Sequence, residues 1–113
     1  MEKGNFSTPT RTVDLSGKGT LDVLKLGDMT VSRATFLPGW RWSVDVKPIV
    51  GGDSCQTLHR GFVVSGRLQV RMNDGSELEY GAGDVWIVPP GHDAWVLGDD
   101  TFEVLEFTLP PAS

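Results

Sequence analysis

The chain has 113 residues, a formal net charge of −5, 14 Gly, 7 Pro and one Cys. The length fits one domain, and the single cysteine excludes an intrachain disulfide. The acidic balance argues against nucleic acid and anionic membranes as partners, because phosphate binding relies on clustered Lys and Arg. No apolar run approaches the roughly 20 residues of a membrane-spanning helix. Without an apolar leader at the N-terminus, we expect a cytoplasmic location.

The first part of the chain divides into an arm and a series of short β-rich runs. Residues 1–11 are polar and show no periodicity, so we expect an N-terminal arm there. A single domain is then expected over residues 12–113. Turn residues close the first two runs, which end at Gly27-Asp28 and Pro38-Gly39.

Residues 40–46 alternate strictly between apolar and polar side chains. A period of two is typical of a half-buried strand, so we predict a strand here with Trp40 and Trp42 on one face. The next segment, residues 47–54, contains a proline and a Gly-Gly pair, which predict a loop.

The clearest hairpin lies in the second half of the chain. Residues 67–72 and 76–80 alternate on either side of an Asn-Asp-Gly sequence, where the Asp-Gly pair favours a tight turn with positive φ. No window of 11 residues shows a helical period. About nine or ten short strands without a helix predict an all-β sandwich or barrel. The last expected strands cover residues 85–88, 94–97 and 101–109.

Glycines and prolines in the second half also match a spaced motif. Gly83, Pro89 and Gly91 stand at the spacings of the second motif of the cupin family, which reads Gly, five residues, Pro, one residue, Gly. Gly66 matches the glycine that closes the family's first motif. The sequence therefore resembles a cupin over roughly residues 31–109. The resemblance implies a single-domain cupin jelly-roll β-barrel, also described as a double-stranded β-helix.

The positions that carry metal ligands in the family hold other residues here. Counting back from Gly66, the position of the family's glutamate is His59, and its two histidines correspond to Asp53 and Cys55. In the second motif the histidine position is Ala94. The usual set of three His and one Glu is absent, so a barrel without any cofactor is one expectation.

A different set of donors can be assembled from nearby residues. Along a straight strand, Cys55 and His59 would lie about 13 Å apart at ~3.3 Å per residue, so both reach one ion only if the strand breaks between them. His92 follows Pro-Pro-Gly in a loop and can turn into the barrel mouth. The three residues would suit Zn or Cu, with Fe, Mn or Ni as further options. The alternative for His59 is a histidine that hydrogen-bonds a neighbour inside the barrel, and for Cys55 it is an inert buried thiol. The alternative for His92 is an imidazole that caps a loop. For Asp53 we expect a role in a turn.

Tryptophans mark the second candidate feature. Of the four Trp residues, we expect Trp42 and Trp95 to line a ligand pocket together with Cys55, His59 and His92. Packing in the core or at a dimer interface is the alternative for both tryptophans.

Three functions remain open on this basis. The first is a small-molecule-binding cupin of unassigned role, with one ligand inside the barrel. The second is a metal-dependent enzyme of dioxygenase or isomerase type, built on Cys55, His59 and His92. The third is a structural or interaction domain with a filled barrel. The resemblance also implies a homodimer, in which residues 1–16 can be lent to the partner.

Overall fold

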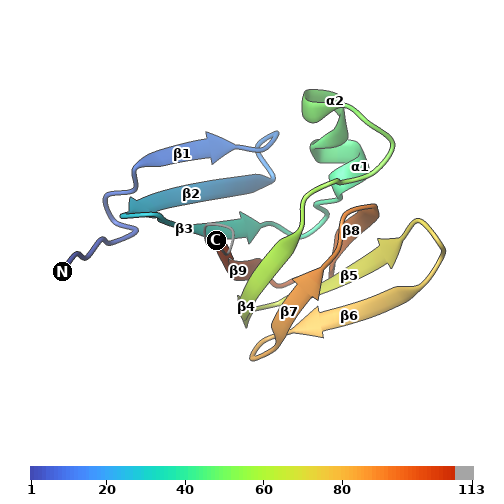
Figure 1. Ribbon diagram of the computed structural model, residues 1–113. Coiled ribbons are helices and arrows are strands. Elements are labelled where there is room, and N and C mark those ends of the chain that lie inside the picture. Colours follow the sequence, from blue (N-terminus) through green and yellow to red (C-terminus); the bar gives the residue numbers. More distant parts are fainter. Residues whose placement is uncertain (109–113) are drawn as a thin grey trace.

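The computed structural model describes residues 1–108, which form nine strands and two short helices. All strand pairs are antiparallel, and the prediction of an all-β jelly roll is confirmed. The strands are β1 (Arg11–Asp14), β2 (Gly19–Leu26), β3 (Met29–Phe36), β4 (His59–Ser65), β5 (Arg67–Met72), β6 (Glu77–Gly81), β7 (Val85–Val88), β8 (His92–Leu97) and β9 (Phe102–Thr108). One sheet has the order β1-β2-β3-β9-β4-β7, and the other has the order β6-β5-β8 (Figure 1).

The core lies between the inward faces of the two sheets, and buried residues alternate with more exposed ones along the strands. In β8 every second residue from His92 is buried, and β5 shows the same alternation at Leu68 and Val70. In β9, Phe102 and Val104 are fully buried. Such regular alternation places one face of each strand against the other sheet, so the barrel wall follows directly from the sequence pattern.

The expected hairpin is confirmed. Strands β5 and β6 pair from Arg67 opposite Gly81 to Arg71 opposite Glu77, and the turn between them has Gly75 at φ +91°. The cupin-spaced Gly66 also has a positive φ, of +79°. A Cβ on Gly66 would fall 2.5 Å from the carbonyl oxygen of Thr101, so backbone packing as well as the turn requires glycine there.

The strand predicted over residues 40–46 is wrong. The chain turns at Gly39 and forms helix α1 (Trp42–Asp45), in which the buried Asp45 carboxylate accepts a hydrogen bond from the backbone N–H of Arg41 at 2.8 Å. Trp42 and Val46 are four residues apart and both line the interior, while Val44 is 62% exposed. A strand and a helix both place two residues that are four positions apart on the same side. The alternation alone therefore could not distinguish a strand from a helix here.

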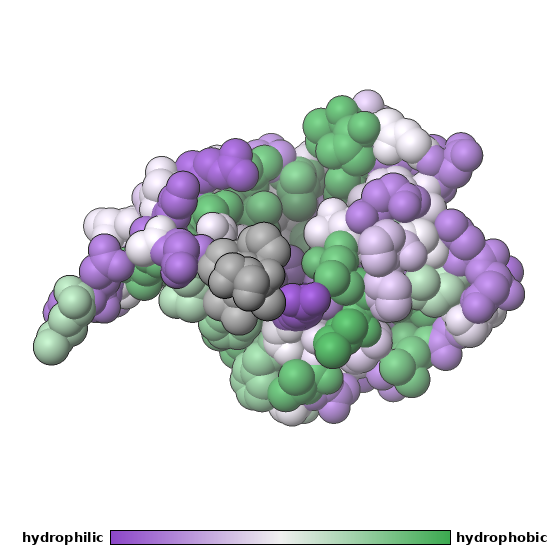
Figure 2. All heavy atoms as spheres, in the orientation of Figure 1, coloured by the Kyte–Doolittle hydropathy of each residue, from purple (hydrophilic) through white to green (hydrophobic). Residues whose placement is uncertain are grey.

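The predicted loop over residues 47–54 also needs correction. Its first half forms helix α2 (Lys47–Val50), with a proline near the start, where a missing N–H is tolerated. The loop begins only at Gly51. Both helices are four residues long, too short to give a helical period. Figure 2 shows apolar residues over α2 and near the β7 edge, where the exposed side chains are Ile49, Val50, Val85 and Ile87.

The N-terminal segment packs against its own chain. β1 pairs with β2, and the Phe6 ring lies under the Arg33 guanidinium at 5.0 Å. The expectation that residues 1–16 are lent to a partner stays a prediction. Neither α1 nor α2, the two helices within residues 1–108, is long enough to cross a membrane. The last predicted strand ends at Thr108 within β9, and Leu109 lies outside the described residues.

Candidate metal and ligand site

A cavity of about 230 Å³ lies inside the barrel. Most of its wall is apolar and includes the rings of Phe36, Trp40, Trp42 and Trp86. The polar lining residues within residues 1–108 are few. They are Cys55, Thr57, His59, His92 and Glu106. The cavity therefore combines an apolar body with a small group of polar side chains.

Backbone hydrogen bonds hold Cys55 beside His92. Cys55 donates its N–H to the carbonyl oxygen of His92 at 2.7 Å, and the N–H of Gly91 returns a bond to the Cys55 carbonyl oxygen at 2.7 Å. Cys55 is not part of a named strand, so the chain is free to bend before β4 begins at His59. This is the break in the strand that Cys55 and His59 need in order to approach each other.

A close strand pairing brings Glu106 against His59. On β4 and β9, Gly61 stands opposite Glu106, and a Cβ on Gly61 would lie 1.9 Å from the carbonyl oxygen of Leu105. Only glycine allows this backbone approach. As a result, the His59 Nδ1 and a Glu106 carboxylate oxygen lie 2.5 Å apart.

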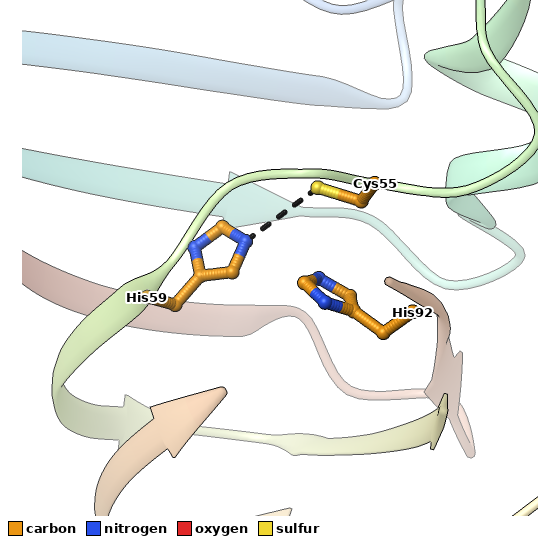
Figure 3. Close-up of side chains that lie close together, drawn as sticks. All are labelled: Cys55, His59 and His92. Carbon is orange, nitrogen blue, oxygen red and sulfur yellow. Dashed lines mark hydrogen bonds between the residues drawn. The ribbon is translucent and has the colours of Figure 1, made fainter. Parts of the chain in front are cut away.

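Both imidazole rings are oriented by partners outside the cluster. His59 bonds Glu106 through Nδ1, and His92 bonds the carbonyl oxygen of Pro89 through Nδ1 at 2.7 Å. The Nε2 of His59 then lies 3.7 Å from the Cys55 Sγ. The ligand atoms of the three residues all lie within 4.8 Å of one another, and Figure 3 shows their side chains gathered around a common space.

The contacts shift two protonation equilibria in opposite directions. Burial raises the pKa of the Cys55 thiol, but hydrogen bonds from the two imidazoles and the backbone N–H of Thr57 outweigh it and lower that pKa from 9.0 to about 5. Burial lowers the pKa of His59, but its bonds to Cys55 and Glu106 outweigh it and raise that pKa from 6.5 to about 9. Without a metal ion, the cluster at neutral pH is a thiolate beside an imidazolium, which is in turn bonded to a carboxylate.

The structure separates the five candidate site residues into two groups. Cys55, His59 and His92 come together, and Trp42 lines the same cavity. Trp95 does not line it. Its ring lies on the other side of β8, with the Arg41 guanidinium 4.3 Å from the ring centroid. His92 is not in a loop as predicted. It is the first residue of β8 and is 3% exposed.

Sequence reasoning missed Glu106 and Thr57. A signal for Glu106 was present, because Phe102, Val104 and Glu106 share one parity in the last strand. A carboxylate in the inward register of a strand needs a buried partner, and His59 is that partner. Thr57 lies in the bend before β4, where no pattern in the sequence fixes the direction of its backbone N–H.

A family model for the EutQ-like cupin domain matches residues 39–108, which include α1, the polar cluster and the strands from β4 to β9. The chain belongs to the EutQ-like cupin family. No curated protein matches this cupin.

Solved structures share the fold of this cupin at low identity. A protein of unknown function from Rhizobium leguminosarum is 19% identical, with a TM-score of 0.65 and coverage of 98% of each chain. A putative ethanolamine utilization protein Q from Salmonella typhimurium is 18% identical, with a TM-score of 0.56 and coverage of 81% of this chain and 69% of that one. A cupin-like protein from Thermotoga maritima is 16% identical, with a TM-score of 0.56, covering 80% and 68%. At these identities, the likeness shows the fold alone.

Proposed function

We propose that this cupin binds a small molecule inside its barrel, and that a divalent metal ion held by Cys55, His59 and His92 forms the polar end of the site. The observation that carries the proposal is the orientation of both imidazoles. Because each Nδ1 is bonded elsewhere, the nitrogen left for a metal is Nε2 in both rings. Histidines that bind metals commonly bond a carboxylate or a backbone carbonyl through their other ring nitrogen.

The donor set fits a transition metal. One thiolate and two imidazoles suit Zn²⁺, whose structural and catalytic sites use Cys and His. Metal binding requires a deprotonated thiol and a neutral imidazole. The lowered pKa of Cys55 meets the first requirement, and an ion bound there would take the place of a proton between the Cys55 Sγ and the His59 Nε2. The set of Cys55, His59 and His92 is therefore compatible with a metal.

The cavity beside the cluster supports the small-molecule part of the proposal. Three protein ligands leave a fourth position of a tetrahedral ion for another molecule, as in catalytic rather than structural zinc sites. Because Cys55, His59 and His92 line the cavity, that position would face about 230 Å³ of mainly apolar space. This arrangement favours a metal-dependent enzyme as the second candidate. It counts against a structural domain with a filled barrel.

Metal analysis tests the proposal. Protein purified without chelators is expected to carry close to one metal ion per chain, and its melting temperature should fall in EDTA, because a bound ion stabilises the folded state. Cys55→Ser should lose the metal. The matched control is Asp53→Asn, which changes an exposed loop residue two positions away and should keep it. Metal-free protein that melts at the same temperature with and without EDTA, and takes up no added Zn²⁺, would overturn the proposal.

A further inference from the structure

The outward face of the larger sheet is covered on its β2–β3 side by the chain's own N-terminal segment. The Phe6 ring centroid lies 5.0 Å from the Arg33 guanidinium on β3. A Cβ on Gly4 would lie 3.5 Å from a methyl group of Leu24, so the segment also passes over β2. Leu24 is buried as a result, although it points away from the barrel interior.

The other half of this outward face, over β9, β4 and β7, is apolar and uncovered within residues 1–108. Phe62 on β4 stands between Leu105 on β9 and Val85 on β7. Their chain neighbours on either side point inward, so these three side chains point away from the core. Figure 2 shows part of this surface as hydrophobic side chains near β7. We call the whole set the apolar face, and its members are Phe62, Val64, Val85, Ile87, Leu105 and Phe107.

The apolar face is large enough for one side of a protein interface. Five of its six side chains are between 40% and 78% exposed. They leave roughly 500 Å² of apolar surface open to water, at ~150–200 Å² for a fully exposed side chain of this kind, which is near the upper end for a monomer. Two such faces packed together bury roughly 1,000 Å² before any polar rim is counted, and specific interfaces begin at about this area.

Two charged side chains mark opposite ends of the apolar face. Arg60 is exposed and precedes Phe62 by two residues on β4. Glu103 lies opposite Ser65, at the far end of the same strand. Within residues 1–108, Arg60 forms no ion pair, and the carboxylate of Glu103 lies 3.8 Å from the Arg33 Nε. The face therefore has a positive end and a negative end with apolar surface between them.

This pattern of charge is complementary to itself. In a two-fold dimer the same patch serves both copies, so each contact is made twice. When two sheets pack face to face with their strands in opposite directions, the Arg60 end of one copy meets the Glu103 end of the other. Strands in the same direction would instead bring like charges together at both rims. The charges therefore favour one orientation of two copies.

We propose that this cupin forms a two-fold homodimer, in which the apolar faces of two copies pack together with their β4 strands running in opposite directions. The dimer buries Phe62 and Val85 and brings Arg60 of each copy to Glu103 of the other. It leaves residues 1–16 on their own chain. It goes beyond the proposed function and does not depend on the metal site, which lies inside the barrel.

The mass in solution tests the inference. Sedimentation velocity over a range of concentrations should give twice the mass of one chain. Val85 is 78% exposed in the single chain, and Val85→Lys should raise the dissociation constant of the dimer at least about 100-fold, because it buries an unpaired charge. Val50→Lys makes the same change at an exposed position on α2 and should leave the dissociation constant unchanged.

Three results would overturn the inference. The first is a wild-type chain that stays monomeric at the highest concentration tested, which would leave the apolar face to a partner of different sequence. The second is an oligomer that Val85→Lys leaves intact, and the third is one that Val50→Lys dissociates equally. Circular dichroism shows whether each variant folds, and Ile87→Lys replaces Val85→Lys if that variant does not.

An exchange of charges tests the direction of the strands. Arg60→Glu and Glu103→Lys should each weaken the dimer by about tenfold, because each brings like charges together at both rims. The Arg60→Glu/Glu103→Lys double variant should return close to the wild-type dissociation constant, since the charges that meet are opposite again. A double variant that binds no more tightly than either single variant contradicts the proposed packing.

Zinc binding separates this inference from the proposed function. The Cys55–His59–His92 cluster lies inside the barrel and Val85 points outward, so Val85→Lys should bind as much Zn²⁺ per chain as the wild type. A dimer that takes up no zinc overturns the metal site and leaves the dimer standing. A monomer that takes up one zinc ion per chain overturns the dimer and leaves the metal site standing.

Discussion

The apolar wall and the polar cluster of the cavity are built in different ways. Most of the wall comes from regular strands, where alternation turns residues such as Leu68 and Val70 inward, and α1 adds Trp42. The cluster comes from places where regular structure stops. Cys55 precedes β4 outside any named strand, and His59 and His92 are the first residues of β4 and β8. Strand pairing thus supplies stability, while the interruptions supply the freedom to bring these three side chains together.

This contrast implies that stability and ligand binding can be changed separately. Substitutions in the wall should lower the free energy of unfolding with little effect on metal affinity per folded molecule. Substitutions around the cluster should do the reverse. The following experiments test this division, from the largest expected effect to the smallest.

Removal of a core ring from β9 should have the largest effect. Phe102 is fully buried, so Phe102→Ala is expected to lower the free energy of unfolding by about 3–5 kcal/mol through lost burial and the cavity left behind. Phe107→Ala on the outward face of the same strand, where the ring is 40% exposed, should cost much less. Urea denaturation measures both. Similar losses for the two variants would contradict the assignment of inward and outward faces.

The carboxylate behind His59 should matter for metal and not for folding. Glu106→Gln keeps the shape but removes the charge that orients the imidazole, and we expect a loss of about 10- to 100-fold in Zn²⁺ affinity. Glu103→Gln, on the opposite face of β9, is the matched control and should leave affinity unchanged. Competition with a chromophoric chelator measures both affinities. An unaltered affinity in Glu106→Gln would show that His59 needs no partner.

The metal-free cluster should give a characteristic dependence of stability on pH. Between about pH 5 and 6.5 the unfolded chain holds a proton on Cys55 that the folded chain lacks, so the free energy of unfolding rises with pH. Between about pH 6.5 and 9 the folded chain holds an extra proton on His59, and this opposite slope cancels the first. We expect a rise followed by a plateau in denaturation curves recorded in EDTA. A Cys55→Ser/His59→Gln double variant should lack that rise; if it shows the same rise, other groups cause it.

The link between α1 and β8 should have the smallest effect. The Asp93 carboxylate accepts hydrogen bonds from the Ser43 backbone N–H at 3.1 Å and from the Arg41 Nε at 3.3 Å. Because these bonds are partly exposed, Asp93→Ala should lower the free energy of unfolding by only about 1 kcal/mol. Thermal melts of this variant and of Asp99→Ala, which changes an exposed turn residue, measure the difference. Equal melting temperatures would show that the link does not stabilise the fold.

The wall could be predicted from the sequence, and the cluster only in part. Alternation gave the β5–β6 hairpin, and the spacing of glycines and prolines indicated the cupin barrel. The same alternation misled over residues 40–46, because a short helix and a strand both turn Trp42 and Val46 inward. Local patterns describe regular structure and become ambiguous over four-residue elements.

The sequence identified the candidate metal-binding residues but not how they are arranged in space. The sequence named Cys55, His59 and His92, but their approach depends on a bend before β4 and on backbone bonds between Cys55 and His92. The pairing of His59 with Glu106 joins residues that are 47 positions apart. Contacts of this kind depend on the register of β4 against β9, which periodicity cannot supply.

Gly61 can help to identify relatives that share the contact between His59 and Glu106. Since a side chain at this position would collide with the backbone of β9, any relative that keeps the contact between its histidine and its glutamate must also keep glycine two residues after the histidine. The short sequence His59-Arg60-Gly61, with a glutamate in the last strand, is therefore a signature by which genomes can be searched. It would separate the cupins that keep this pair of histidine and glutamate from those that share only the barrel.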